Sequence, residues 1–143
     1  MEPKQLFEAC SALSEERHPS PDPEQWQSIT DPHARTLAAL TALYRYYAAD
    51  AKGLQLVLRD AAVLPELQET LRPFTEYIQA IAGDLAASWS LGKPGVELRA
   101  AASLAVNFST WRTLADNGVD PDEAAELVAV MVAAVAKSQA AEQ

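Results

Sequence analysis

The sequence predicts an all-α protein, and three features of the chain support this class. Alanine and leucine dominate long stretches of the 143 residues, whereas runs of β-branched residues are scarce. The nine prolines and five glycines gather at the apparent ends of these stretches. Between the ends, apolar residues recur at a spacing of three to four, which is typical of helices that bury one face. We therefore expect one globular domain over residues 1–143, a bundle of about six helices.

The N-terminal part of the chain should contain one helix and a proline-rich loop. A helix is expected over residues 3–17, with Cys10 on its apolar face. Three prolines within residues 18–23 exclude a helix there, because proline removes a backbone donor and forces the preceding residue into an extended conformation. A brief turn over residues 24–29 should then return the chain to the core through Trp26.

Aspartate followed by proline is a frequent helix start, because the carboxylate caps the first turn and proline suits its first position. Asp31 is followed by proline and should start a helix over residues 32–49. A short helix is expected over residues 50–60, with uncertain ends.

Two further prolines divide the next stretch of the sequence. Pro65 suits the first turn of another helical segment. Pro73 lies inside the pattern that follows, where it would remove a backbone hydrogen bond, so we expect a kink or a restart there. Apolar residues then keep helical spacing over residues 74–89.

The last fifty residues predict two antiparallel helices that also form the subunit interface. One helix should cover residues 94–117, and Gly118 should end it. Asp120 should cap a second helix that ends near residue 140. Residues 127–136 carry no charge but are fewer than the about 20 residues that span a bilayer. Both helices are apolar on more than one side, so we expect them to pair with a second copy as a four-helix bundle.

The predicted interface of this homodimer consists of apolar and small residues of the two C-terminal helices. They are Ala101, Leu104, Ala105, Leu127, Val128, Met131, Ala134 and Val135.

Charge and cysteine content restrict the function classes. The formal net charge of −9 disfavours direct contact with nucleic acid phosphates, which usually requires a basic patch. A single cysteine cannot form an internal disulfide, and no secretion signal opens the chain, so we expect a cytoplasmic protein without membrane attachment.

No catalytic residue, metal ligand or cofactor-binding motif is predicted, so we expect no enzyme activity. The histidines His18 and His33 lie beside prolines, where a solvated role is the usual one. Cys10 is expected to be a buried, inert thiol. The five glycines are scattered and do not form a phosphate-binding loop.

Several segments, spread over nearly the whole chain, carry a family resemblance. They are Leu6-Phe7-Glu8-Ala9-Cys10-Ser11, the proline-rich loop that ends in Trp26, Asp31-Pro32-His33-Ala34-Arg35, Leu43-Tyr44-Arg45-Tyr46-Tyr47, Val57-Leu58-Arg59-Asp60-Ala61 with Pro65-Glu66-Leu67, and Phe108-Ser109-Thr110-Trp111-Arg112-Thr113-Leu114. In this order they resemble the C-terminal regulatory domain of TetR-family transcriptional repressors. The resemblance implies a ligand-sensing domain whose final two helices pair across a two-fold axis. Family members begin with a helix-turn-helix domain, and the residues before Pro3 are too few to hold one; the chain is either trimmed to the sensor or has lost its DNA reader.

Aromatic side chains on the long helices are the candidates for a ligand pocket, because such pockets are mostly apolar with a few polar groups. The pocket should be bounded by helices 32–49, 74–90 and 94–117. Its candidate residues are Tyr44, Tyr47, Phe74, Tyr77, Ile81, Asn107, Phe108 and Trp111. Packing in the core is the alternative for the aromatic residues. Asn107 lies in an apolar helical pattern, so its amide must find a partner in a ligand, a facing helix or a second subunit.

These observations lead to one main hypothesis for the function and two alternatives. A small lipophilic effector would favour one dimer geometry and so control DNA binding by the absent domain. A stand-alone helical scaffold or interaction module would instead have a filled core and bind no small molecule. A helical-bundle enzyme would need inward-facing histidines or acids in a cluster, which the sequence lacks.

Overall fold

The protein is all-α. The computed structural model describes residues 2–142, without the side chain of Pro3, and within this range it contains eight helices and no strand. The helices are α1 (Pro3–Arg17), α2 (Glu24–Gln27), α3 (Pro32–Ala49), α4 (Ala51–Val63), α5 (Pro65–Ser88), α6 (Val96–Val106), α7 (Phe108–Asp116) and α8 (Pro121–Ala141). The fold class is thus confirmed, whereas the expected number of about six helices is too low.

Three residues that were predicted to begin or end a helix, Asp31, Asp120 and Gly118, do so in the structure. The Asp31 carboxylate accepts the backbone N–H of Ala34 at 2.8 Å and caps α3. Asp120 caps α8 in the same way, and in both helices proline follows the cap. Gly118 has a φ of 84°, a left-handed conformation that glycine adopts without steric cost and that ends α7.

Two expected breaks differ from the structure. Of the kink or restart expected at Pro73, the restart does not occur, because α5 continues through this residue. Pro73 is exposed, so water can satisfy the carbonyl that loses its backbone donor. The single helix expected over residues 94–117 is instead two helices, because Asn107 adopts an extended conformation and separates α6 from α7.

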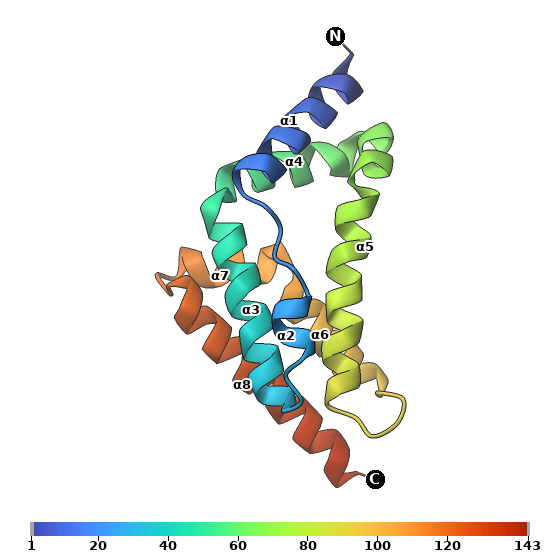
Figure 1. Cartoon of the computed structure of the whole chain (residues 1–143), viewed down its shortest axis with the longest axis vertical. Coiled ribbons are helices and arrows are strands. Elements are labelled where there is room, and N and C mark those ends of the chain that lie inside the picture. The colour runs from blue at the N-terminus through green and yellow to red at the C-terminus, as the bar shows by residue number, and fades with distance from the viewer. Residues whose placement is uncertain (1, 143) are drawn as a thin grey trace.

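The main core forms around α3, which lies in the middle of the molecule and crosses α8 (Figure 1). The contact is close because the inner face of α8 is rich in alanine, including Ala124, Ala125 and Ala129, which are fully buried. Larger side chains of α3, α5, α6 and α7 fill the remaining volume. This core is therefore built mainly from residues 32–49 and the C-terminal half of the chain.

Helices α1 and α4 form a separate, smaller layer at the opposite end of the molecule from the C-terminus (Figure 1). Helix α5 runs along one side and connects this layer with the main core. Among the described residues, the core of this layer has three buried side chains, Phe7 of α1, Ala61 of α4 and Leu67 at the start of α5. The layer thus has a much smaller core than the rest of the chain. The cavity described below lies in this layer.

Arg35 fixes the proline-rich N-terminal segment to the main core. Its guanidinium group donates to both carboxylate oxygens of Asp84 on α5. It also donates to the backbone carbonyl of Gln27 at 2.9 Å. Trp26, which is fully buried, is held in the core by this connection and by the contacts of α2 with α3.

Helix α8 is long and apolar enough to cross a membrane by length and composition alone. Its 21 residues include an 18-residue window with a mean hydropathy of 1.4, a third of which is buried inside the protein. The expectation that this segment is too short to span was based on the uncharged residues 127–136 only. The helix packs on α3 and α6, and such burial gives the core helices of soluble proteins the same apolar composition.

Candidate functional site

The predicted pocket among α3, α5 and the α6–α7 segment is largely filled by the residues that were expected to line it. Tyr44 and Tyr47 are fully buried, and Ile81 and Trp111 are nearly so. The rings of Tyr47, Phe108 and Trp111 pack against one another, with the Tyr47 and Phe108 centroids 5.4 Å apart. These side chains belong to the main core of the protein.

The two buried tyrosines hold the break between α6 and α7. The hydroxyl group of Tyr44 donates to the carbonyl of Ala105 at 2.6 Å. The hydroxyl group of Tyr47 donates to the next carbonyl, that of Val106. Both carbonyls end α6, where the normal backbone donors are missing. The tyrosine hydroxyls therefore have a structural role.

Asn107 finds its partner in its own chain segment. Its side-chain oxygen accepts the backbone N–H of Ser109 at 2.8 Å and so caps α7. The side chain is exposed, and the partner of its oxygen is none of the three that were expected, namely a ligand, a facing helix or a second subunit. An N-cap is the ordinary position for asparagine.

A shallow cavity remains beside this filled region. It has a volume of about 270 Å³, and Tyr47, Phe74, Asn107 and Phe108 are four of the predicted residues on its wall. Tyr77 lies apart from it, and its hydroxyl group donates to the carbonyl of Pro21 in the proline-rich loop. The structure therefore brings four of the eight predicted residues together around an open space.

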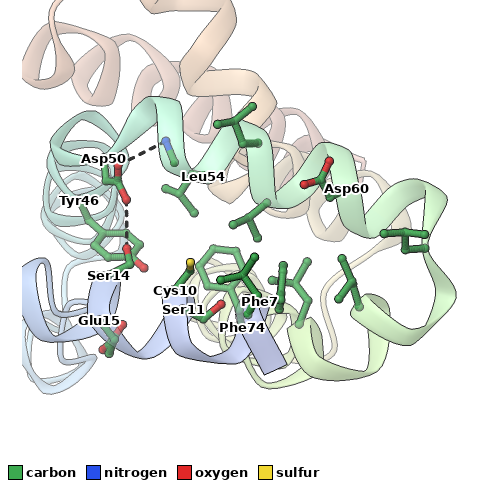
Figure 2. A pocket seen from close by; sticks show the side chains of 17 residues that line it. Phe7, Cys10, Ser11, Ser14, Glu15, Tyr46, Asp50, Leu54, Asp60 and Phe74 are labelled. Atoms are coloured by element: carbon green, nitrogen blue, oxygen red, sulfur yellow. Dashed lines mark hydrogen bonds between the residues drawn. The ribbon is translucent and has the colours of Figure 1, made fainter. Parts of the chain in front are cut away.

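A cavity twice as large lies in the N-terminal layer, between α1, α4 and the first half of α5. Its volume is about 540 Å³, within the range of small-molecule sites. Figure 2 shows Phe7, Leu54 and Phe74 among the apolar side chains around it. Tyr46 and Asp50, at the end of α3, close one end of the cavity. Phe74 lines both this cavity and the shallow one.

Local sequence explains why this space stays open. Asp50 caps α4 by accepting the backbone N–H of Gly53 at 3.3 Å, and the chain turns there from α3 into α4. Helix α4 then crosses above α1, with Leu54 on the side that faces the cavity (Figure 2). Val57 of α4 also lines the cavity. Serine and cysteine face them from α1, namely Ser11, Ser14 and Cys10, and these side chains are too small to fill the gap.

Polar groups gather at one end of the cavity. The hydroxyl group of Ser14 donates to the Asp50 carboxylate at 3.0 Å, which links α1 to the α3–α4 turn (Figure 2). Burial raises the pKa of the Tyr46 phenol to about 12, and the negative charges of Glu15 and Asp50 act in the same direction. The rest of the wall is mainly apolar, so the arrangement fits a largely apolar molecule with one polar end.

Sequence reasoning missed most of this cavity. Cys10 was expected to be buried, whereas it is exposed and lines the cavity. The available signal was that residues 3–17 and 51–63 form two short helices, each with an apolar face. Within residues 2–142, no group of three histidine, cysteine, aspartate or glutamate side chains is arranged to hold a metal ion.

The predicted interface residues divide into two sets. Ala105 and Val128 face the core of their own protomer and are almost completely buried, so they are not available to a partner. Ala101 and Val135 are half-buried. The exposed members are Leu104, Leu127, Met131 and Ala134.

Two exposed apolar residues were not predicted as part of this surface. Val96 on α6 and Val130 on α8 are 70% and 57% exposed. Helices α6 and α8 pack against each other, so their outward faces adjoin. We call the exposed residues Val96, Leu104, Leu127, Val130, Met131 and Ala134 the α6–α8 face. Its large apolar residues stay in water in a single copy of the chain, as does Leu91 outside this face.

Comparisons of the chain with protein-family models, with curated proteins and with solved structures found no match.

Proposed function

We propose that the chain is the effector-sensing and dimerisation domain of a TetR-like transcriptional repressor. The observation that carries the proposal is the cavity of about 540 Å³ between α1, α4 and α5, which is apolar over most of its wall and polar at one end. This combination favours a small lipophilic effector. The site is displaced from the predicted one toward the N-terminal layer, and Phe74 is the residue that the two share.

The α6–α8 face supports the second half of the proposal, the homodimer. Three large apolar side chains on α8, those of Leu127, Val130 and Met131, are each about half exposed. Pairing with the same face of a second copy would remove them from water and form a four-helix bundle. In this proposal α6 and α8, rather than the last two helices, contribute the interface.

A change in the position of α1 would connect effector binding with DNA binding. Helix α1 forms one wall of the cavity, and among its described side chains, those of residues 4–17, only that of Phe7 is buried. A ligand that binds one position of α1 more tightly than another shifts the equilibrium between them. A DNA-reading domain joined to the N-terminal end of α1 would then move relative to its partner in the dimer.

The same proposal sets the location and the partners. The protein would act in the cytoplasm, without enzyme activity, cofactor or membrane contact, and would reach DNA only through a helix-turn-helix domain. Its charge of −9 supports the last point, because the phosphate backbone repels an acidic domain.

One observation favours the alternative of a helical scaffold. The main core is filled, and Tyr44, Tyr47 and Trp111 leave no internal space there for a ligand. A scaffold would take up no small molecule in the N-terminal layer either, so a binding experiment separates the two functions.

The neutral dye Nile red, which fluoresces more strongly in apolar sites, is a suitable probe for the cavity. We expect saturable binding that is lost in Val57→Trp, because the indole ring fills the space between α4 and α1. Val130→Trp adds the same ring to the α6–α8 face and should keep the binding. Nile red should also slow the alkylation of Cys10, the only cysteine and part of the cavity wall. Unchanged alkylation and no saturable binding would favour the scaffold.

A further inference from the structure

The charged side chains around the large cavity all carry the same sign. Glu15, Asp50 and Asp60 line it, and within residues 2–142 no lysine, arginine or histidine does so. Asp60 is paired with Arg59. Glu15 and Asp50 belong to none of the ion pairs formed by the described residues. The negative charge at this end of the cavity is therefore not neutralised by a cation of the described chain.

Neutral donors hold these two carboxylates in place. Asp50 accepts from the hydroxyl group of Ser14 at 3.0 Å and from a backbone N–H of α4. One oxygen of Glu15 accepts the hydroxyl and the backbone N–H of Ser20, at 2.7 and 3.0 Å. Hydrogen bonds of this kind orient a carboxylate but leave its charge unbalanced. Figure 2 shows Ser14, Glu15, Tyr46 and Asp50 together at one end of the cavity.

The same end has an aromatic wall. Tyr46 lies beside the two carboxylates, and the raised pKa of its phenol reflects burial first and then their negative charge. The rings of Phe7 and Phe74 continue the wall toward the apolar part of the cavity. Aromatic faces attract organic cations and also pack against apolar groups.

Building on the proposed effector site, we propose that the cavity binds a lipophilic organic cation. Its positive centre lies beside Asp50 and Glu15, within reach of the Tyr46 ring, and its alkyl or aromatic body lies among the leucines of α4 and α5. An anionic effector would bring a further negative charge to a partly buried site that holds no cation of the described chain, which is unfavourable. The protein therefore discriminates among hydrophobic molecules by the sign of their charge.

Tetraphenylphosphonium and tetraphenylborate test this proposal, because the two ions have nearly the same shape and opposite charge. Each competes with Nile red for the full-length chain, and displacement gives its apparent Kd. We expect tetraphenylphosphonium to bind at least about tenfold more tightly, with an affinity that falls as salt rises.

Charge-neutral substitutions locate the effect in the cavity. Asp50→Asn keeps the cap of α4, because asparagine caps helices as well as aspartate does. Combined with Glu15→Gln, it should weaken tetraphenylphosphonium binding by about tenfold or more beyond any change in Nile red affinity measured on the same variant. Glu76→Gln is the matched control, because Glu76 is an exposed acid of α5 outside the cavity wall. It should leave both affinities unchanged.

The possible results separate this inference from the proposed function. Equal or tighter binding of tetraphenylborate overturns the cation proposal, while Nile red binding still supports an effector site. The cation proposal is also overturned if the double variant and Glu76→Gln bind the phosphonium ion with equal affinity. The ion would then bind to the acidic surface of the protein and not in the cavity. Failure of Nile red to bind the cavity overturns the proposed function itself, and the cation proposal with it.

Discussion

The hydroxyl group of Tyr44 donates a 2.6 Å hydrogen bond to the carbonyl of Ala105, across 61 positions of the sequence. That carbonyl would normally accept the N–H of Ser109, four residues later, but this donor is bonded to the Asn107 side chain instead. The next carbonyl, Val106, loses its donor in the same way, because the N–H of Thr110 bonds the carbonyl of Asn107. The α3 tyrosines and the α7 cap together therefore stabilise the break between α6 and α7.

Replacing Tyr44 with phenylalanine should destabilise the protein by about 1–3 kcal/mol, because the carbonyl of Ala105 stays buried without a donor. Urea unfolding followed by circular dichroism measures the change. Tyr46→Phe is the control, since the hydrogen bonds among residues 2–142 do not include the Tyr46 hydroxyl. A cost for Tyr44→Phe no larger than that of the control would contradict the structural role of this bond.

Asn107→Ala should destabilise the protein by roughly 0.5–2 kcal/mol, because the first turn of α7 loses its cap. Asn107→Asp keeps an acceptor at the same place and should restore most of the stability. If Asn107 instead served a continuous helix, alanine would raise the stability, since alanine has the higher helix propensity. Equilibrium unfolding of the three proteins distinguishes these outcomes.

These helix boundaries were predictable because single residues determine them locally. Asp31, Asp120 and Gly118 each act on the backbone of their own turn, without help from distant segments. Asn107 was recognised as unusual, but its role depends on two tyrosines of α3, whose hydroxyl groups donate to the carbonyls at the break. No pattern within residues 94–117 contains that information, so a continuous helix was the natural expectation.

The cavity could not be predicted from the sequence for a related reason. Helical spacing identifies the apolar faces of α1 and α4 but does not tell whether the facing side chains fill the space between them. Packing puts Cys10 and Ser14 opposite Leu54 and Val57, and the gap results from their small size. Conversely, the rings of Tyr47, Phe108 and Trp111 pack against one another, so the predicted pocket became core.

The stability of the protein should fall above about pH 10. All four tyrosines, Tyr44, Tyr46, Tyr47 and Tyr77, have a pKa raised mainly by burial, to about 12 for Tyr46. The unfolded chain releases these protons near pH 10, whereas the folded protein keeps them. The stabilising contribution is therefore complete below pH 10 and is lost as the pH rises through the folded pKa values.

Two measurements check the alkaline prediction. Tyrosinate absorbance should titrate later in the folded protein than in urea, and the urea midpoint should fall between pH 9 and about 11.5. Tyr44→Phe should reduce the slope of that fall, because one titrating group is removed. A folded titration that coincides with the unfolded one would show that the phenols are not protected.

The final prediction concerns the α6–α8 face. Sedimentation velocity at micromolar concentration should show a dimer, because Leu127, Val130 and Met131 otherwise remain in water. Met131→Glu should give a folded monomer, since Met131 is 53% exposed in the single chain and a charge there disturbs only the pairing.

Two further substitutions make this test specific. Leu91→Glu also replaces an exposed apolar residue with an acid, but in the loop before α6, and should leave the dimer intact. Val128→Glu puts a charge into the protomer's own core, where Val128 is 4% exposed, so it should unfold the chain. The proposed interface requires that one face of α8 packs in the core of its own protomer and the opposite face packs against a partner. A wild-type monomer, or a Met131→Glu protein that stays dimeric, would contradict this division.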